Sequence, residues 1–145
     1  MDYKKEAVSD LRRYLAMKRG VENNRERMAA LEAEARGVRL SLDDGVKVLG
    51  GGGHAEDRLI NILAERERLR LTNRAVRPLV RAMDRAMELL SDGERNVLER
   101  FYVDRRPGYL DVLCDELGYE ERQIYNIKDE ALRKFTLAMY GIEAF

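Results

Sequence analysis

The sequence predicts an all-α protein, and three observations support this. Apolar residues recur at helical spacing along two long stretches, residues 3–38 and 55–90. The chain is 37% charged and has two prolines and no tryptophan, which is typical of long helices with exposed charged faces. The segment "SDGE", from Ser91 to Glu94, is a capping box that starts a further helix. We therefore expect two modules, residues 1–90 and 91–145.

The first expected helix covers residues 3–38. Its apolar seam is narrow, and Gly20 weakens it because glycine disfavours a helix interior. The seam repeats every seven residues at Ala7, Tyr14, Val21, Met28 and Ala35.

Residues 37–54, "GVRLSLDDGVKVLGGGGH", interrupt the helical pattern. The alternating runs on either side of "DDG" could form a small β-hairpin. The four glycines of Gly50–Gly53 could instead cradle a phosphate, but His54 and the acidic Glu56 follow them where such a loop needs Lys and Ser or Thr. We therefore expect a Gly-rich loop at residues 37–54 that links two helices.

The second expected helix covers residues 55–90. Pro78 predicts a kink or a break near Val76–Arg77, and the polar seam residues Arg66 and Asn73 are expected at exposed edges. Two seamed helices and a loop predict an antiparallel, coiled-coil-like hairpin for association or partner binding; packing of each helix in an ordinary bundle is the alternative. The seam residues are Leu59, Ile62, Leu69, Val76, Val80, Met83, Met87 and Leu90.

The C-terminal module, residues 91–145, reads as three short helices. The first follows the capping box and ends at the Pro107–Gly108 turn. The second covers residues 110–117, and Gly118 then supplies the positive φ of a sharp turn. The third begins at Glu120 or Glu121, so the last two helices form a helix-turn-helix. Its expected buried residues are Leu110, Leu113, Leu117, Ile124, Ile127, Ala131, Leu132 and Phe135.

The outward residues of the third helix suit recognition of DNA in the major groove. Arginine pairs with guanine, and glutamine or asparagine with adenine, so Arg122, Gln123 and Asn126 are the candidate base readers. Lys128 and Arg133 are candidate phosphate contacts. The full set of candidate DNA-binding residues is Glu121, Arg122, Gln123, Tyr125, Asn126, Lys128 and Arg133.

The segment "LSDGERNVLERFY…YLDVLCDELGYEERQIYNIKDEALRKF" resembles region 4 of sigma-70-type factors. The whole chain is similar, more loosely, to phage-encoded transcriptional regulators of the RinA/ArpU kind. The resemblance implies promoter recognition by the helix that begins near Glu121, with contact to host RNA polymerase. This sequence departs from the pattern at Glu120, Glu121 and Asp129, where sigma factors are richer in Arg and Lys, and no sigma region 2 is recognisable in residues 1–90.

The net charge is zero but unevenly distributed. Residues 1–90 carry 19 Lys+Arg and 15 Asp+Glu, and residues 91–145 carry 8 and 12, so +4 balances −4. The module expected to touch DNA is thus the acidic one. This counts against tight nonspecific binding by that module, which depends on neutralising phosphates with Lys and Arg.

These observations predict a DNA-binding transcriptional regulator of phage or prophage genes. Its expected partners are double-stranded promoter or operator DNA, RNA polymerase and a second copy of the chain. A protein–protein adaptor acting on RNA polymerase without DNA binding, and a small-terminase-like packaging component, remain alternatives. We expect no enzyme, metal or cofactor, because no nucleophile–base pair, ligand cluster or phosphate motif is present. The single Cys114 and the absence of a long apolar run predict a cytoplasmic protein with no membrane contact, and the resemblance to phage regulators implies that the cell is a bacterial host.

Overall fold

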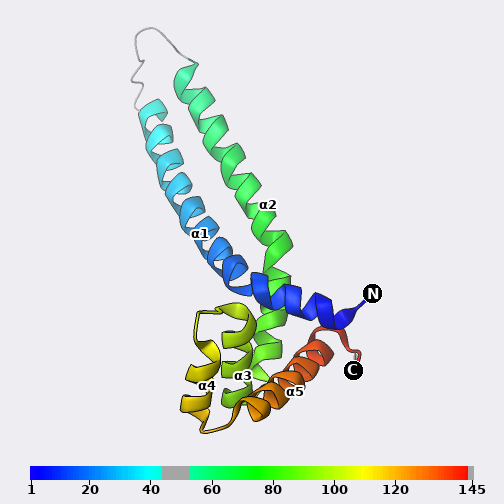
Figure 1. Cartoon of the computed structure of the whole chain (residues 1–145). Helices are drawn as coiled ribbons and strands as arrows, with labels where there is room; N and C mark the ends of the chain where they lie inside the picture. The colour runs from blue at the N-terminus through cyan, green and yellow to red at the C-terminus, as the bar shows by residue number, and fades with distance from the viewer. Residues whose placement is uncertain (44–52, 144–145) are drawn as a thin grey trace. The chain divides into compact units, whose positions relative to one another are not determined.

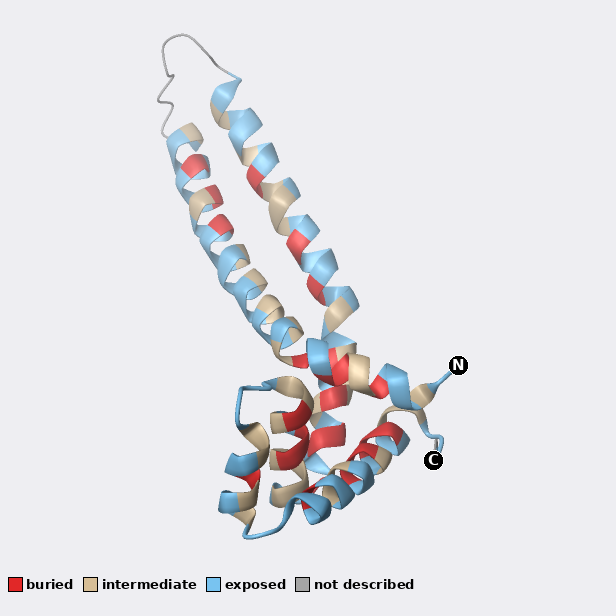
Figure 2. Cartoon of the chain, viewed as in Figure 1, coloured by how far each residue is buried: buried red, intermediate tan, exposed pale blue. Residues whose placement is uncertain are grey.

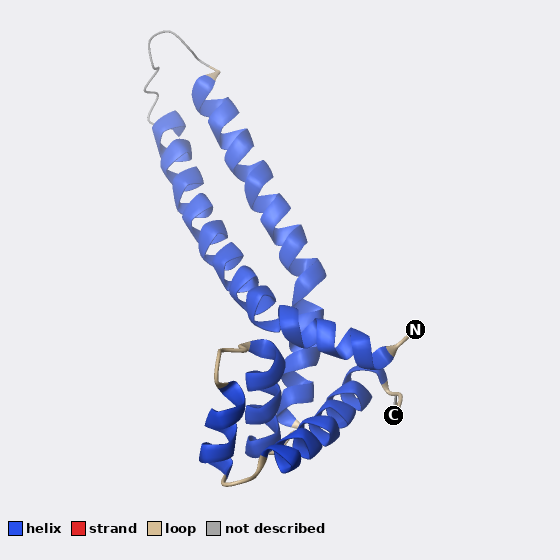
Figure 3. Cartoon of the chain, viewed as in Figure 1, coloured by secondary structure: helices blue, strands red, loops and turns tan. Residues whose placement is uncertain are grey.

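The computed structural model describes residues 1–43 and 53–143 of the chain. These residues form helices and connecting turns, and no strand occurs among them (Figures 1 and 3). The predicted all-α class is therefore confirmed for the described residues. The elements are α1 (Tyr3–Asp43), α2 (His54–Glu88), α3 (Asp92–Leu98), the π-helical turn η1 (Glu99–Val103), α4 (Tyr109–Leu117) and α5 (Glu121–Tyr140).

Helix α1 extends further than the sequence pattern predicts. It continues through Gly37 to Asp43, so the loop begins later than expected and the possible strand of the "VRLSL" run, residues 38–42, is wrong. The reason is tertiary packing: Val38 is buried and Leu42 is partly buried against the same cluster as Leu31 and Ala35. The rest of the predicted loop, residues 44–52, lies outside the described residues.

Helix α2 is one helix from His54 to Glu88 with Pro78 inside it, so of the two expected outcomes near Val76–Arg77, a kink or a break, the break does not occur. Proline inside a helix removes one backbone hydrogen bond and crowds the carbonyl four residues earlier. Val80 and Met83 are buried directly after Pro78 and fix the following turns in place.

The chain divides into two compact units, which are described separately. Unit 1 comprises residues 1–18 and 78–145, and unit 2 comprises residues 19–77. The sequence-based division at residue 90 assigned the start of α1 and the end of α2 to the N-terminal module. In the structure these two segments group with α3, η1, α4 and α5.

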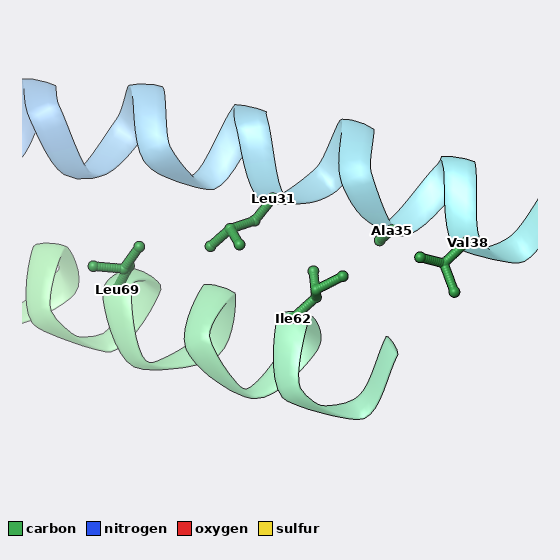
Figure 4. Close-up of a cluster of buried hydrophobic side chains, with 5 residues drawn as sticks. All are labelled: Leu31, Ala35, Val38, Ile62 and Leu69. Atoms are coloured by element: carbon green, nitrogen blue, oxygen red, sulfur yellow. The ribbon is translucent and has the colours of Figure 1, made fainter. Parts of the chain in front are cut away.

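In unit 2, α1 and α2 run antiparallel. Leu31, Ala35 and Val38 point toward α2, and Ile62 and Leu69 point toward α1 (Figure 4). Ion pairs flank this apolar line. Arg27 Nε lies 3.5 Å from Glu65 Oε1, and Arg58 Nη2 lies 2.9 Å from Glu34 Oε1, so the residue number falls along α2 as it rises along α1.

Asn73 in unit 2 differs from its expected exposed position. Its side chain is 4% exposed. Its Nδ2 donates to the Val21 carbonyl at 3.0 Å, and its Oδ1 accepts from Asn24 Nδ2 at 3.0 Å. The donor and the acceptor of this amide are therefore both hydrogen-bonded inside the seam. These bonds offset the free-energy cost of burying the amide.

In unit 1, the N-terminal turns of α1 are fixed by buried polar contacts. Asp10 is 3% exposed, and its carboxylate accepts from the Tyr140 hydroxyl and from Arg13. Tyr14 donates to Asp84, which also accepts from Lys18 at 3.1 Å. These contacts join the first helix to the end of α2 and to the end of α5, and Figure 2 shows buried residues on each of these segments.

Candidate nucleic-acid interface

Helices α4 and α5 are joined by a tight turn that depends on Gly118. This residue has φ 72°, the left-handed conformation expected from the sequence, and its N–H donates to the Cys114 carbonyl at 2.9 Å. Glycine is favoured there because a Cβ strains this backbone conformation. Residues 119 and 120 complete the turn, and α5 begins at Glu121 as expected.

One face of α5 is buried in the core of unit 1. Ile124, Ala131, Leu132 and Phe135 are buried as predicted, whereas Ile127 is only partly buried. Leu113 of α4 and the residues Val97 and Phe101 pack against Ile124. This packing fixes the rotation of α5 and therefore determines which side chains face solvent.

The three candidate base readers lie together on the exposed side of α5. Arg122, Gln123 and Asn126 are all exposed. Within the described residues, none of their side chains makes a hydrogen bond or an ion pair. They line an open hollow of about 570 Å³, whose other lining residues are Glu94, Glu120, Ile127 and Glu130.

Arg122 differs from the other cations of α5 because it alone has no carboxylate partner in this fully described helix. Lys128 Nζ lies 2.6 Å from Asp129 Oδ1. Lys134 Nζ lies 2.9 Å from Glu94 Oε2. Arg133, predicted as a phosphate contact, pairs with Glu130 at 2.6 Å and with Glu143 at 2.7 Å. The charge available to an incoming anion on α5 is thus concentrated at its N-terminal end.

Carboxylates border the hollow, and one of them, Glu94, belongs to the cap of α3. Its Oε1 accepts from the Ser91 backbone N–H at 3.1 Å, while Ser91 Oγ accepts from Glu94 N–H at 3.2 Å, so the predicted capping box is confirmed. Partial burial opposes ionisation of Glu94. The hydrogen bonds from Lys134 and Ser91 outweigh it, and the pKa of Glu94 falls below its usual value.

Tyr125 and Lys128, two further candidate residues, belong to an aromatic cluster. The ring of Tyr125 meets Phe101 edge-on, with centroids 5.6 Å apart, while 42% of the residue remains exposed. Lys128 Nζ lies 5.7 Å from the Tyr125 centroid and 6.0 Å from that of Phe101. The remaining candidate, Glu121, is exposed in the first turn of α5.

Sequence reasoning missed the residues around η1. Phe101 and Tyr109 make an edge contact at 5.1 Å, and the Arg105 guanidinium carbon lies 4.6 Å from the Tyr109 centroid. The segment "DRRPGY" reads only as a turn in the sequence. The four-residue separation of Arg105 and Tyr109 was the available signal, but it carries meaning only once the turn that brings them together is known.

No family model, curated protein or solved structure matches the chain. The interpretation of this surface therefore depends on its own chemistry.

The exposed side chains of Arg122, Gln123 and Asn126 are hydrogen-bonding groups. Burial, followed by the charges of Glu121, Asp111 and Asp115, raises the pKa of the Cys114 thiol, which disfavours the nucleophilic thiolate. No group of three or more His, Cys, Asp or Glu side chains suited to a metal ion occurs in residues 1–43 and 53–143. In the same residues, no helix has the length and apolarity needed to cross a bilayer.

Proposed function

We propose that this chain is a DNA-binding transcriptional regulator of phage or prophage genes, acting in the cytoplasm of the bacterial host. The single observation that carries the proposal is the unpaired Arg122 beside the exposed amides of Gln123 and Asn126 at the start of α5. An arginine that has no carboxylate partner offers a ligand an uncompensated charge and all its donors. Here it stands on a helix whose orientation the core fixes.

The three side chains have the chemistry of base recognition. A guanidinium can donate two hydrogen bonds to O6 and N7 of guanine, and an amide can donate to N7 and accept from N6 of adenine. Residues in the first turns of a recognition helix are the ones that reach base edges. Arg122 and Asn126 are one turn apart on the same face, so they can address neighbouring base pairs.

The tight turn at Gly118 supports a helix-turn-helix reading of α4 and α5, with the sigma-region-4-like pattern of the sequence. In this proposal the antiparallel α1 and α2 of unit 2 act as a coiled-coil-like hairpin that binds a second copy of the chain. Asn73 supports the pairing of α1 with α2 inside one chain, because a satisfied polar residue in a seam specifies register.

A second candidate function is an adaptor that binds RNA polymerase without binding DNA. The observation that favours it is the acidic balance of residues 91–145, with 8 Lys+Arg against 12 Asp+Glu. An acidic module disfavours DNA on its own. Polymerase bound to the same promoter would supply the missing affinity, and this links the two candidate functions.

The deciding experiment is a selection of fragments from sheared bacterial and phage DNA by the purified full-length protein, with and without RNA polymerase. The regulator predicts enrichment of discrete fragments, and Arg122→Ala with Gln123→Ala abolishes it. Recovery of polymerase without selective DNA favours the adaptor. Asn61→Ala, an exposed amide change on α2, is the matched control and keeps the selection unchanged.

A further inference from the structure

Cationic and aromatic side chains gather on the flank of α5 that adjoins η1. We define the basic–aromatic patch as Arg12, Tyr102, Arg105, Tyr109, Tyr125 and Lys128, all in unit 1.

Ring contacts make the patch continuous. Phe101 lies beneath it and is 6% exposed. Its centroid is 6.0 Å from that of Tyr102, 5.1 Å from Tyr109 and 5.6 Å from Tyr125. The rings are thus held by one buried side chain, and the cations lie on or beside them.

Arg105 is held in place without being neutralised. Its guanidinium lies over the Tyr109 ring, and Nη2 donates to the Tyr109 hydroxyl at 2.8 Å. No carboxylate pairs with Arg105 or with the exposed Arg12 in the described part of the chain. Stacking and one hydrogen bond leave other donors of the guanidinium unused, and preorganisation lowers the entropy lost on binding.

The charges of three cations reach Tyr102. Arg12, Arg105 and Lys128 all act electrostatically on Tyr102 and favour its ionised form, against burial, which is the largest influence and leaves its pKa raised. Asp129 acts on Tyr102 in the opposite direction, and it is paired with Lys128 at 2.6 Å. Because Lys128 is paired with this carboxylate, Arg12 and Arg105 are the cations of the patch that have no carboxylate partner in the described part of the chain.

The position of the patch on α5 indicates its ligand. Tyr125 and Lys128 follow Arg122 by three and six residues, so they lie on the flank of the helix beside the base-reading face. A helix in the major groove has base edges in front of it and phosphates along both walls. Arginine and tyrosine side chains are common donors to those phosphates.

We propose that the basic–aromatic patch binds phosphodiester groups of the DNA backbone beside the groove that α5 enters. This inference rests on the proposed function and assigns the phosphate contacts of that site. It differs from the sequence-based expectation, which gave this role to Arg133 as well as Lys128. Arg133 is held by Glu130 and Glu143, so it contributes little free charge.

The test measures affinity of the full-length protein for a random-sequence duplex by fluorescence anisotropy over a series of salt concentrations. The negative slope of log K against log salt becomes less steep by about 0.9 for each phosphate contact that is lost. We expect this loss in Arg12→Gln and in Arg105→Gln, and the double variant loses about twice as much. Arg105→Lys retains the charge and keeps most of the slope.

Two charge-matched controls are built into the same series. Arg58→Gln removes a cation that is paired with Glu34, and it leaves the slope unchanged. Arg133→Gln tests the competing assignment. A slope that falls with Arg133→Gln and not with the patch variants overturns the proposal, and so does a wild-type protein that fails to bind the duplex at low salt. Circular dichroism confirms that each variant retains its helix content.

Failure of the inference and failure of the proposed function give different results. If the patch variants bind random duplex with an unchanged slope while Arg122→Ala still abolishes fragment selection, phosphate binding by the patch is overturned and base reading by α5 is not. Patch variants that lower the slope, while Arg122→Ala and Gln123→Ala leave selection intact, support the patch and overturn base reading by α5.

Discussion

Asn73 of α2 and Val21 of α1 are joined across the two long helices by a hydrogen bond of 3.0 Å from Asn73 Nδ2 to the Val21 carbonyl. Side-chain bonds to a backbone carbonyl of another helix are specific to one register. The bond, with the one from Asn24, explains how an amide can occupy a seam that is otherwise apolar.

Asn73→Ala is expected to lower the free energy of unfolding of the full-length protein by about 1–3 kcal/mol, because it removes a buried donor and acceptor and leaves Asn24 without its partner. Urea denaturation followed by circular dichroism measures the change. Asn61→Ala, on the exposed side of the same helix, is the control and should be near neutral. Equal effects of the two changes would show that the buried amide bonds do not stabilise the pair of helices.

The hydrogen bond from Tyr140 to Asp10 predicts that the folded state loses stability at alkaline pH. Burial, followed by the bond to Asp10, raises the pKa of the Tyr140 hydroxyl above its usual value. The folded state therefore keeps a proton that the unfolded state releases. The stabilisation is fully present below a pH of about 10, the ordinary tyrosine pKa, and is lost as the pH rises above it.

Tyr140→Phe should accordingly be less stable than the wild type at neutral pH by about 1 kcal/mol, and its stability should fall less steeply above pH 10. Denaturation at a series of pH values measures both. Tyr119→Phe changes an exposed tyrosine and serves as the control. An alkaline slope that Tyr140→Phe leaves unaltered would assign the loss to another group, of which Tyr14 is the next candidate because its pKa is also raised.

The ionised side chain of Glu94 predicts that the folded state loses stability at acidic pH. Its pKa is lowered in the folded state, so its contribution is present above the ordinary glutamate pKa of about 4.3 and is lost as the pH falls below it. Glu94→Gln should remove this part of the acid dependence. Glu99→Gln, at an exposed position, should not. If the two variants follow the same acid profile, the contacts of Glu94 with Lys134 and Ser91 do not stabilise its ionised form.

Substitution of glycine by alanine is expected to have opposite effects on stability at Gly118 and at Gly20. Gly118 has φ 72°, so Gly118→Ala strains the turn before α5 and costs about 1–2 kcal/mol. Gly20 lies inside α1 with no atom within 4 Å of an added Cβ, so Gly20→Ala should raise stability by about 0.5–1 kcal/mol. Thermal melts of the two variants give the comparison. A Gly118→Ala protein as stable as the wild type would mean that the turn can relax without the left-handed residue.

Local signals made much of the C-terminal module predictable. The capping box at Ser91 and the turn at Gly118 depend on neighbours within four residues, and the buried residues of α5 follow the helical period. The predicted end of α1 failed because a tertiary contact, that of Val38 with the α2 cluster, extended the helix beyond the local pattern. The exposed place given to Asn73 failed because its partner, Val21, lies 52 residues away.

The sequence predicts which functional groups the candidate site carries, but not which ion pairs and stacking contacts they form. The exposed positions of Arg122, Gln123 and Asn126 follow from the period of α5. The ion pair of Arg133 with Glu143 depends on the turn after α5, and the stacking of Arg105 on Tyr109 depends on the turn before α4. Neither turn can be derived from helical spacing.

The bond between Asp10 and Tyr140 spans 130 residues of chain. During synthesis the ribosome therefore makes Asp10 well before Tyr140. The first helix can form early, but its buried aspartate gains its tyrosine donor only after the 130 residues between them have been made. Unit 1 is therefore completed only after Tyr140 has emerged, and until then the apolar side chains Ala7 and Leu11, both fully buried in the finished fold, remain exposed to other chains or to chaperones.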